Sequence, residues 1–136
     1  HSKSSYGLLV FLLSNQKIHT QAERKILENM RSPFIVQLHY AFQSESRLYL
    51  VMDFMIGGEL FFHLRREKRF NVEKTRLYSA QIILALEYLN KKNIIYRDLK
   101  PENILVGEDG YLKITDFGLS KVIMVGEKSY TFCGTP

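Results

Sequence analysis

A long stretch with helical spacing, residues 72–92, constrains the fold more than any other feature of this sequence. Its apolar residues recur in steps of three and four, which predicts a helix with one wide apolar face. The residues on that face are Tyr78, Ile82, Ala85, Leu86 and Leu89. Asn71, directly before the stretch, is a residue type that commonly caps helices. A chain with such a helix needs other elements that cover this face.

Several short strands are predicted around this helix. Residues 35–42 and 47–54 are apolar runs separated by a polar turn, so we expect them to pair antiparallel. After the helix, residues 93–95, 104–106 and 111–115 have the composition of strands, and the turn "GEDG" joins the last two. These elements are the candidates for covering the helix.

The most apolar run is "GLLVFLL", residues 7–13. It is too short to span a membrane, which takes about 20 apolar residues. No small-residue cleavage site follows it, so a signal peptide is not expected. The run is therefore predicted to be a buried strand.

Two further helices are predicted. Residues 19–30 form the first, where Thr20 and Glu23 have the spacing of a capping box and Pro33 ends the helix. Residues 59–67 form the second, directly after two glycines. The segment "DFMIGGE" before it has the composition of a hinge.

Composition limits the partners of the chain. Apolar residues make up 46% and charged residues 24%, a normal globular balance. The net charge of +5 favours anionic partners such as nucleotides, but the basic residues look scattered, so no nucleic-acid partner is predicted. The single cysteine, Cys133, excludes an intrachain disulfide and fits a reducing compartment. Because the first residue is His1, we expect the chain to be a piece of a longer protein.

The segment "YRDLKPENIL", residues 96–105, carries the polar residues with the clearest chemistry. Asp98 and Asn103 have the D-x-x-x-x-N spacing of a phosphoryl-transfer loop. In such a loop the aspartate accepts the proton of the attacking hydroxyl, the asparagine holds Mg²⁺, and Lys100 would neutralise charge on the transferred group. Taken alone, the segment could equally be an acidic turn with Asn and Pro.

A second motif, "ITDFGLS", follows a predicted strand. Mg²⁺ prefers hard oxygen ligands and usually takes one or two protein carboxylates. Asp116 would be its second ligand, beside Asn103. A plain turn at the end of a strand is the alternative, but the order of the two motifs, with a hairpin between them, favours the joint interpretation as a phosphoryl-transfer site.

From about residue 19 onwards the chain resembles a eukaryotic protein kinase, and it is most similar to the AGC group of serine/threonine kinases. The segments that carry the resemblance are "YRDLKPEN", "GGELFFHLRR", "PFIVQLHYAF" and "TFCGTP". The resemblance implies a two-lobe α+β fold that is truncated at both ends. Residues 1–52 would be an incomplete N-lobe with 1–18 poorly matched, 53–58 the hinge, and 59–136 the C-lobe up to the activation segment.

The resemblance also implies an ATP site. The backbone from Asp53 to Met55 would bind adenine, and Met52 would border the pocket. Glu59 would bind ribose, and Glu102 and Leu105 would also line the nucleotide site. Glu59 and Glu102 would attract basic residues ahead of the target serine or threonine, although both could be ordinary surface acids.

Other residues take their expected roles from the same resemblance. Glu23 would pair with a strand lysine that holds ATP's phosphates, with the capping box as its alternative. Thr131 matches an activation-loop phosphorylation site for an upstream kinase, with Arg97 as the natural partner of the phosphate and Ser129 as a rival site. Thr135 would contact Asp98 and Lys100 on the substrate side. Cys133 is predicted to be a small packed hydrophobe. Four apolar residues would form a column that aligns the lobes: Leu27, Leu38, Tyr96 and Phe117.

The sequence also departs from the family. No glycine-rich loop precedes residue 19, and Leu9 stands where the strand lysine would align. The helices that would cover the apolar face of residues 78–89 are absent, so we expect part of that face to be exposed.

The expected function is Mg-ATP-dependent phosphorylation of Ser or Thr in protein substrates. The expected location of the protein is the cytoplasm, with the nucleus as a further location. A catalytically dead module that binds nucleotide or a partner is the alternative, and a structural interaction protein is a third.

Overall fold

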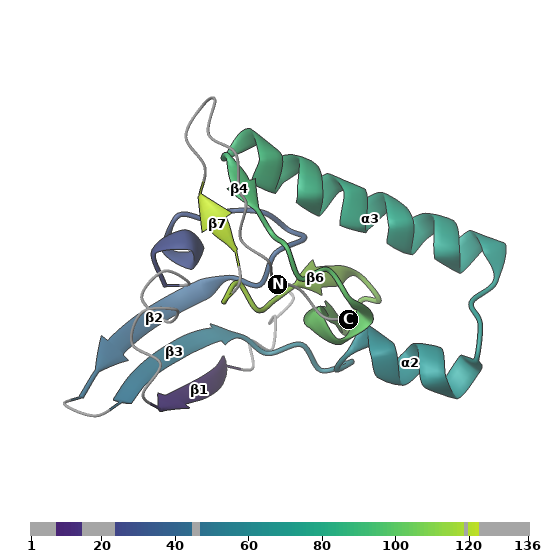
Figure 1. The fold of residues 1–136 in the computed structure, drawn as a ribbon. Helices are drawn as coiled ribbons and strands as arrows, with labels where there is room; N and C mark the ends of the chain where they lie inside the picture. Colours follow the sequence, from purple (N-terminus) through teal and green to yellow (C-terminus); the bar gives the residue numbers. More distant parts are fainter. Residues whose placement is uncertain (1–7, 15–23, 45–46, 119, 123–136) are drawn as a thin grey trace, which may run out of the picture.

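The computed structural model describes residues 8–14, 24–44, 47–118 and 120–122. Figure 1 shows a three-stranded sheet on one side of the molecule, helices α2 and α3 on the other, and short strands between them. The sheet and the long helices come from separate parts of the chain, which confirms the expected α+β class. None of the helices in the described part of the chain combines the length and apolarity that crossing a bilayer requires.

The sheet contains β1 (Leu8–Ser14), β2 (Leu38–Gln43) and β3 (Arg47–Asp53), with β3 in the centre. Both neighbours run antiparallel to β3, so a strand within residues 7–13 and the hairpin on either side of residues 43–46 are confirmed. The burial expected for the first strand concerns side chains outside the described residues. The end of β3 at Asp53 brings the chain from the sheet into residues 53–58, the segment that we expect to be the hinge.

The strand predicted over residues 35–42 begins later than expected, at Leu38. The N–H of Val36 donates to the carbonyl of Ile114 at 3.0 Å, and the N–H of Ile114 donates to the carbonyl of Phe34 at 2.9 Å. The residues before Leu38 therefore bond to β6 (Leu112–Ile114) rather than to β3. This contact joins the first part of the chain to the strand that leads into Asp116.

The predicted helices are present where the structure describes them. Residues 24–28 are helical, whereas Thr20 and Glu23 lie outside the described residues. Helices α2 (Leu60–Glu67) and α3 (Val72–Lys91) follow the expected bounds closely. Asn71 caps α3, since its Oδ1 accepts the N–H of Lys74 at 2.8 Å.

Two small hairpins follow α3. The short β4 (Ile94–Ile95) pairs with β7 (Lys121–Val122), a strand that the sequence did not predict. A 3₁₀ turn, η1 (Pro101–Asn103), leads into β5 (Ile104–Val106), which pairs antiparallel with β6. Gly110 has a φ of 79° in the turn between β5 and β6, a conformation that glycine adopts without steric cost.

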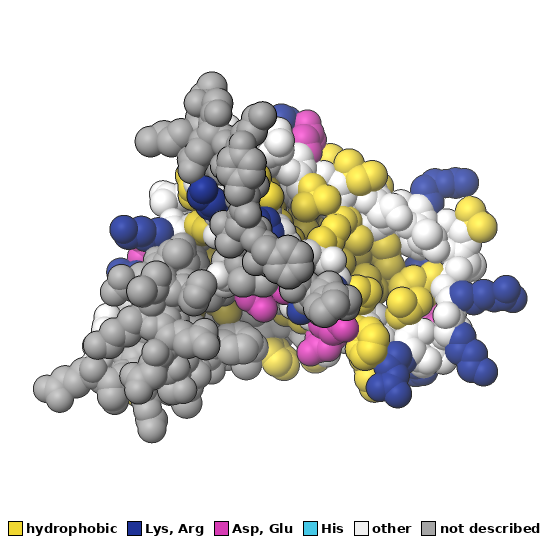
Figure 2. All heavy atoms as spheres, in the orientation of Figure 1, with side chains coloured by type: hydrophobic (Ala, Val, Ile, Leu, Met, Phe, Trp, Pro, Cys, Tyr) yellow, Lys and Arg dark blue, Asp and Glu magenta, His cyan; other side chains and the backbone are white. Residues whose placement is uncertain are grey.

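The apolar face predicted for α3 is largely covered. Tyr78, Ala85 and Leu89 are buried, and Ile82 and Leu86 are half-buried. Other apolar residues of the helix are exposed: Leu77 at 51%, Ile83 at 63% and Leu84 at 46%. Figure 2 shows hydrophobic side chains at the surface along α3. The expectation of partial exposure along residues 78–89 is therefore confirmed for Ile83 and Leu84, whereas β5, β6 and the main core cover Tyr78, Ala85 and Leu89.

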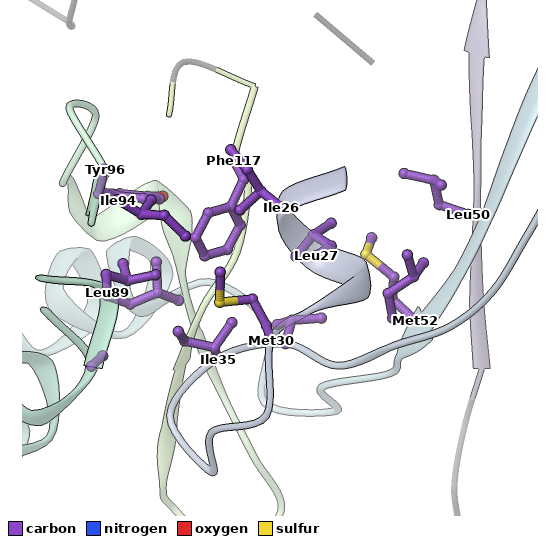
Figure 3. Close-up of a cluster of buried hydrophobic side chains, with 14 residues drawn as sticks. Ile26, Leu27, Met30, Ile35, Leu50, Met52, Leu89, Ile94, Tyr96 and Phe117 are labelled. Carbon is purple, nitrogen blue, oxygen red and sulfur yellow. The ribbon is translucent and has the colours of Figure 1, made fainter. Parts of the chain in front are cut away.

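The main core lies between the sheet, α3 and the segment after β6. Figure 3 shows side chains from residues 24–30, β3, α3 and the segments after β4 and β6 pointing toward one another. Phe117 is fully buried, and Leu27, Leu89 and Ile114 are each about 1% exposed. The core therefore holds together the elements that carry the candidate site.

Candidate active site

The segment between β4 and β5 places Asp98, Lys100 and Asn103 close together. The Asn103 amide Nδ2 donates to the Asp98 carbonyl at 3.0 Å and to the Asp98 Oδ2 at 2.9 Å. The ammonium of Lys100 lies 3.0 Å from the same Oδ2. Asp98 and Asn103 are 8% and 6% exposed, so these contacts are partly shielded from water and their geometry is well defined. The sequence prediction that the three residues converge is confirmed.

The local backbone explains how this constellation forms. Arg97, directly before Asp98, has a φ of 70°, which turns the chain sharply after β4. Pro101 begins η1, where its missing N–H costs nothing. The N–H of Asn103 then donates to the carbonyl of Lys100 at 3.0 Å and closes the turn. The loop is thus shaped by short-range bonds of its own residues.

Asp116 lies at the same end of the β5–β6 hairpin as Asn103. Ile104 pairs with Ile114, and the N–H of Thr115 donates to the carbonyl of Asn103 at 3.0 Å. Asn103 therefore precedes β5 just where Asp116 follows β6. Asp116 is exposed and has a φ of 57°, and its Oδ1 accepts the N–H of Gly118 at 3.2 Å. The two predicted metal ligands are brought to one edge of the hairpin.

The donor set at this edge fits Mg²⁺ of the kind that binds together with a nucleotide. Among the described residues no group of three His, Cys, Asp or Glu side chains could hold a metal ion. Asn103 and Asp116 offer one amide and one carboxylate, both hard oxygen donors. Mg²⁺ commonly takes one or two protein ligands and completes its shell with phosphates and water. The site suits such a shared ion and not an all-protein cage.

The carboxylate of Asp53 in the hinge joins three parts of the chain. Its Oδ2 lies 2.6 Å from the Lys113 ammonium on β6 and accepts the N–H of Gln37 at 3.1 Å. Its Oδ1 lies 2.7 Å from Nε2 of His39 on β2. Burial alone raises the pKa of Asp53, but the hydrogen bonds from its three partners outweigh burial and leave the pKa below its ordinary value.

Because the Asp53 carboxylate already contacts Lys113, His39 and Gln37, a ligand at this segment would bind to backbone groups rather than to the Asp53 side chain. The N–H of Asp53 donates to the carbonyl of Gln37, and the N–H of Met55 makes no backbone hydrogen bond within the described part of the chain. Met52 is buried in the main core, and Met55 packs against its edge. Adenine binding by this backbone, which the kinase resemblance implies, stays a prediction.

The expected hinge is attached to β5, the strand that directly follows Asn103. The N–H of Gly57 donates to the carbonyl of Val106, and the N–H of Val106 donates to the carbonyl of Gly58, both at 2.9 Å. A Cβ on Gly57 would lie 2.6 Å from the Val106 oxygen, so only glycine permits this approach. The backbone of Glu59 then pairs with that of Leu105.

Glu59 and Glu102 lie on neighbouring elements as a result. Glu59 is exposed at the start of α2, and Glu102 is half-buried in η1, which packs against α2. Leu105 is half-buried at the edge of the main core. The structure thus brings together the acids that the sequence assigned to ribose and to basic substrate residues.

Comparison with known proteins identifies the family of this chain. The protein kinase domain matches residues 12–136. The chain belongs to the protein kinase family.

Several similar proteins indicate which group of kinases the chain resembles. It is 56% identical to "Protein kinase 2" of Dictyostelium discoideum over 118 residues, which cover 87% of this chain and 25% of that protein. It is 55% identical to "Serine/threonine-protein kinase sgk-1" of Caenorhabditis elegans over 90% of this chain and 27% of that protein. It is 49% identical to human "RAC-beta serine/threonine-protein kinase" over 93% of this chain and 27% of that protein. The chain therefore spans about a quarter of the length of these relatives.

These relatives are AGC-group serine/threonine kinases, so the group assignment made from the motifs is confirmed. The four apolar residues that the resemblance assigned to an aligning column lie in one cluster. Leu27, Leu38, Tyr96 and Phe117 all belong to the main core. The rings of Tyr96 and Phe117 meet edge to face at 5.3 Å, and the Tyr96 hydroxyl donates to the carbonyl of Thr115. The main core thus connects the helix of residues 24–28 to Tyr96 and Phe117, which lie one in each of the two motifs.

Some predicted kinase residues cannot be placed. Glu23, Ser129, Thr131, Cys133 and Thr135 lie outside the described residues. The backbone of Leu9 pairs with Met52 in the sheet.

The sequence analysis missed the roles of Lys113 and His39 in binding Asp53. Their one signal is that both are polar residues within apolar strands, which does not reveal the partner.

Proposed function

We propose that this chain is part of the catalytic domain of a serine/threonine kinase that transfers the γ-phosphate of ATP to protein substrates. The observation that carries the proposal is the hydrogen-bonded group of Asp98, Lys100 and Asn103 at the edge where Asp116 also lies. The identity to serine/threonine kinases supports the choice of acceptor.

In the proposed reaction the substrate hydroxyl attacks the γ-phosphorus while the bond from that phosphorus to the bridging oxygen breaks and ADP leaves. Asp98 orients the hydroxyl and accepts its proton. Lys100, held beside Asp98, supplies positive charge near the transferred group. Asn103 keeps the Asp98 carboxylate in place through the contact at 2.9 Å.

Asn103 and Asp116 would hold Mg²⁺ through their side-chain oxygens. When bound, the ion would offset the negative charge of the phosphates. The hinge backbone at Asp53 and Met55 would bind adenine, with Met52 behind it and Leu105 below it. Glu59 would bind ribose. These roles rest on the resemblance and on the positions described above.

We further propose that Glu59 and Glu102 favour substrates with basic residues near the target, because Glu59 precedes α2 and Glu102 lies in η1, which packs against α2. Phosphorylation of Thr131 by an upstream kinase would add charge that Arg97 can bind. The single cysteine fits action in the cytoplasm or nucleus.

Transfer of labelled phosphate from ATP to a basic serine peptide tests the proposal. The experiment uses the protein that carries this sequence, with Asp98→Asn as the test variant and Glu108→Gln as an exposed acidic control. Loss of the proton acceptor should lower kcat by about 10²–10⁴-fold, whereas the control should retain full activity. Nucleotide binding without transfer by the unaltered protein would instead identify the catalytically dead binding module.

A further inference from the structure

The positive charge of the chain gathers in one region, contrary to the scattered distribution that the sequence suggested. Residues 65–76 contain six lysines and arginines and two acids, a net charge of +4, while the whole chain carries +5. These residues form the end of α2, the connection after it and the start of α3. We call this region the basic surface, and its cations are Arg65, Arg66, Lys68, Arg69, Lys74 and Arg76.

Most of this charge is not neutralised within the described structure. The Lys74 ammonium lies 2.7 Å from Glu67, and this hydrogen bond holds the pKa of Glu67 below its ordinary value. Arg66 lies 3.9 Å from the same carboxylate. The remaining four cations of the basic surface are exposed and form no ion pair with any described residue: Arg65, Lys68, Arg69 and Arg76.

The fold itself accounts for only part of the cluster. Arg65 and Arg66 lie in the last turn of α2, where the helix dipole favours cations. Arg69 lies between the helices, and Arg76 lies near the N-terminal end of α3, where the dipole does not favour a cation. The concentration of charge therefore exceeds what stabilising the two helices requires.

Lys68 adds a second indication that the charge is used. It ends α2 with a φ of 63° and a ψ of −39°, a conformation outside the regions that side chains allow easily. Such a backbone is strained for a residue with a Cβ, and glycine is the usual choice at the end of a helix. A lysine at this strained position is consistent with a role for its ammonium outside the protein.

The basic surface lies at the opposite end of α2 from Glu59. The eight residues of α2 span about 12 Å, a distance that about four extended residues cover. Figure 2 shows acidic side chains near the middle of one face of the molecule and Lys and Arg side chains along its edge, over α2 and the start of α3. One extended substrate could therefore contact Glu59 and Glu102 near the candidate site and then, about four residues further along, the cations of the basic surface.

We propose that the basic surface binds an acidic segment of the protein substrate, located upstream of the basic residues that Glu59 and Glu102 bind. This inference rests on the proposed function, since it extends the substrate preference of the same site. In such a substrate the basic residues would face Glu59 at the start of α2, and the acidic segment would face the basic surface at its end. A uniformly anionic partner, such as DNA or a lipid surface, would bring its charge against Glu59 and Glu102 instead.

Two peptides with the same basic residues and serine test the proposal. One carries four glutamates about four residues upstream of the basic residues, and the other carries four glutamines there. With the unaltered protein, the acidic peptide should have a KM about 10-fold lower at equal kcat, because several exposed ion pairs each contribute a small factor. The difference should fall as salt rises.

The test variant is Arg69→Glu/Arg76→Glu, which reverses two exposed charges of the basic surface. It should abolish the preference and keep its activity on the glutamine peptide. Lys92→Glu is the matched control, because it reverses one exposed charge at the far end of α3 and should retain the preference. Equal KM values for both peptides with the unaltered protein would overturn the proposal, and so would an unchanged preference in the double variant.

A binding measurement separates this inference from the proposed function. A labelled acidic peptide with alanine in place of the target serine should bind the unaltered protein and lose about 10-fold in affinity with the double variant, measured by fluorescence anisotropy. This result would support docking even if no phosphate is transferred. Tighter binding to duplex DNA or to phosphatidylserine vesicles than to the acidic peptide would refute the substrate as the occupant.

Discussion

Replacing Lys113 by methionine should lower the free energy of unfolding by about 2 kcal/mol, because it removes the ion pair that joins the hinge to β6. The Lys113 ammonium lies 2.6 Å from the Asp53 carboxylate, and the two side chains are 26% and 12% exposed. Methionine keeps most of the length and apolar volume of lysine. The substitution therefore tests the charge and its hydrogen bond more than the packing.

The expected magnitude follows from the burial of the pair. A hydrogen bond to a charged group contributes about 1.5–3 kcal/mol, whereas a fully exposed ion pair contributes about 0.2–1 kcal/mol. Asp53 retains His39 and the N–H of Gln37 after the substitution, so its carboxylate is not left without donors. An effect near 2 kcal/mol, in the lower half of the range for charged hydrogen bonds, is therefore expected.

A double-mutant cycle of Lys113→Met and Asp53→Asn, measured by urea unfolding, isolates the interaction. Its coupling energy should exceed about 1 kcal/mol. The exposed pair of Arg24 and Glu28, with side chains 41% and 42% exposed, is the control and should couple by about 0.3–0.5 kcal/mol. A coupling for the hinge pair no larger than that of the surface pair would refute the reasoning.

The same carboxylate predicts a pH dependence. The pKa of Asp53 lies below its ordinary value of 3.8, so the folded state binds its proton less readily than the unfolded state does. Its stabilising effect should be fully present above about pH 4 and decline as the pH falls through the lowered pKa. The difference in unfolding free energy between the unaltered protein and Asp53→Asn should accordingly be smaller at pH 3 than at pH 7. A difference that grows on acidification would contradict this sign.

Substitutions at four further positions test individual parts of the fold. Asn71→Ala should cost about 1 kcal/mol in chemical denaturation by removing the cap of α3, and Asn71→Ser should restore most of it. Gly57→Ala should cost about 1–3 kcal/mol because its Cβ would lie 2.6 Å from the Val106 oxygen. At Gly58 a Cβ would have open space but the φ is 66°, so Gly58→Ala should cost about 1–2 kcal/mol, less than Gly57→Ala. A larger decrease in melting temperature for Gly58→Ala than for Gly57→Ala would contradict this order. Phe117→Ala should cost about 3–5 kcal/mol, and a calorimetric change below 1 kcal/mol would show that this fully buried ring is not needed for the core.

Much of the architecture could be predicted because its signals are local. The spacing of apolar residues located α3, and Asn71 located its start. Two apolar runs around a polar turn located the β2–β3 hairpin. The pairing of β4 with β7 was missed, since two-residue strands carry almost no pattern. The beginning of β2 was misplaced because Phe34 and Val36 bond to Ile114, far along the chain.

In the candidate site, too, contacts within one short loop could be predicted, whereas contacts between distant segments could not. The spacing of Asp98, Lys100 and Asn103 predicts that their side chains lie close together, because all three belong to one short loop. The contact of Asp53 with Lys113 joins residues sixty positions apart, and no local pattern reports which partner a polar strand residue will find.

The order of residues along the chain was enough to establish the family, the two motifs and the long helix, since each depends on neighbours within a few turns or a short loop. Folding in three dimensions decided which backbone pairs with Ile114 and what neutralises Asp53. Those outcomes depend on the packing of distant segments around one core, where burial and hydrogen-bond geometry select partners that spacing alone leaves open.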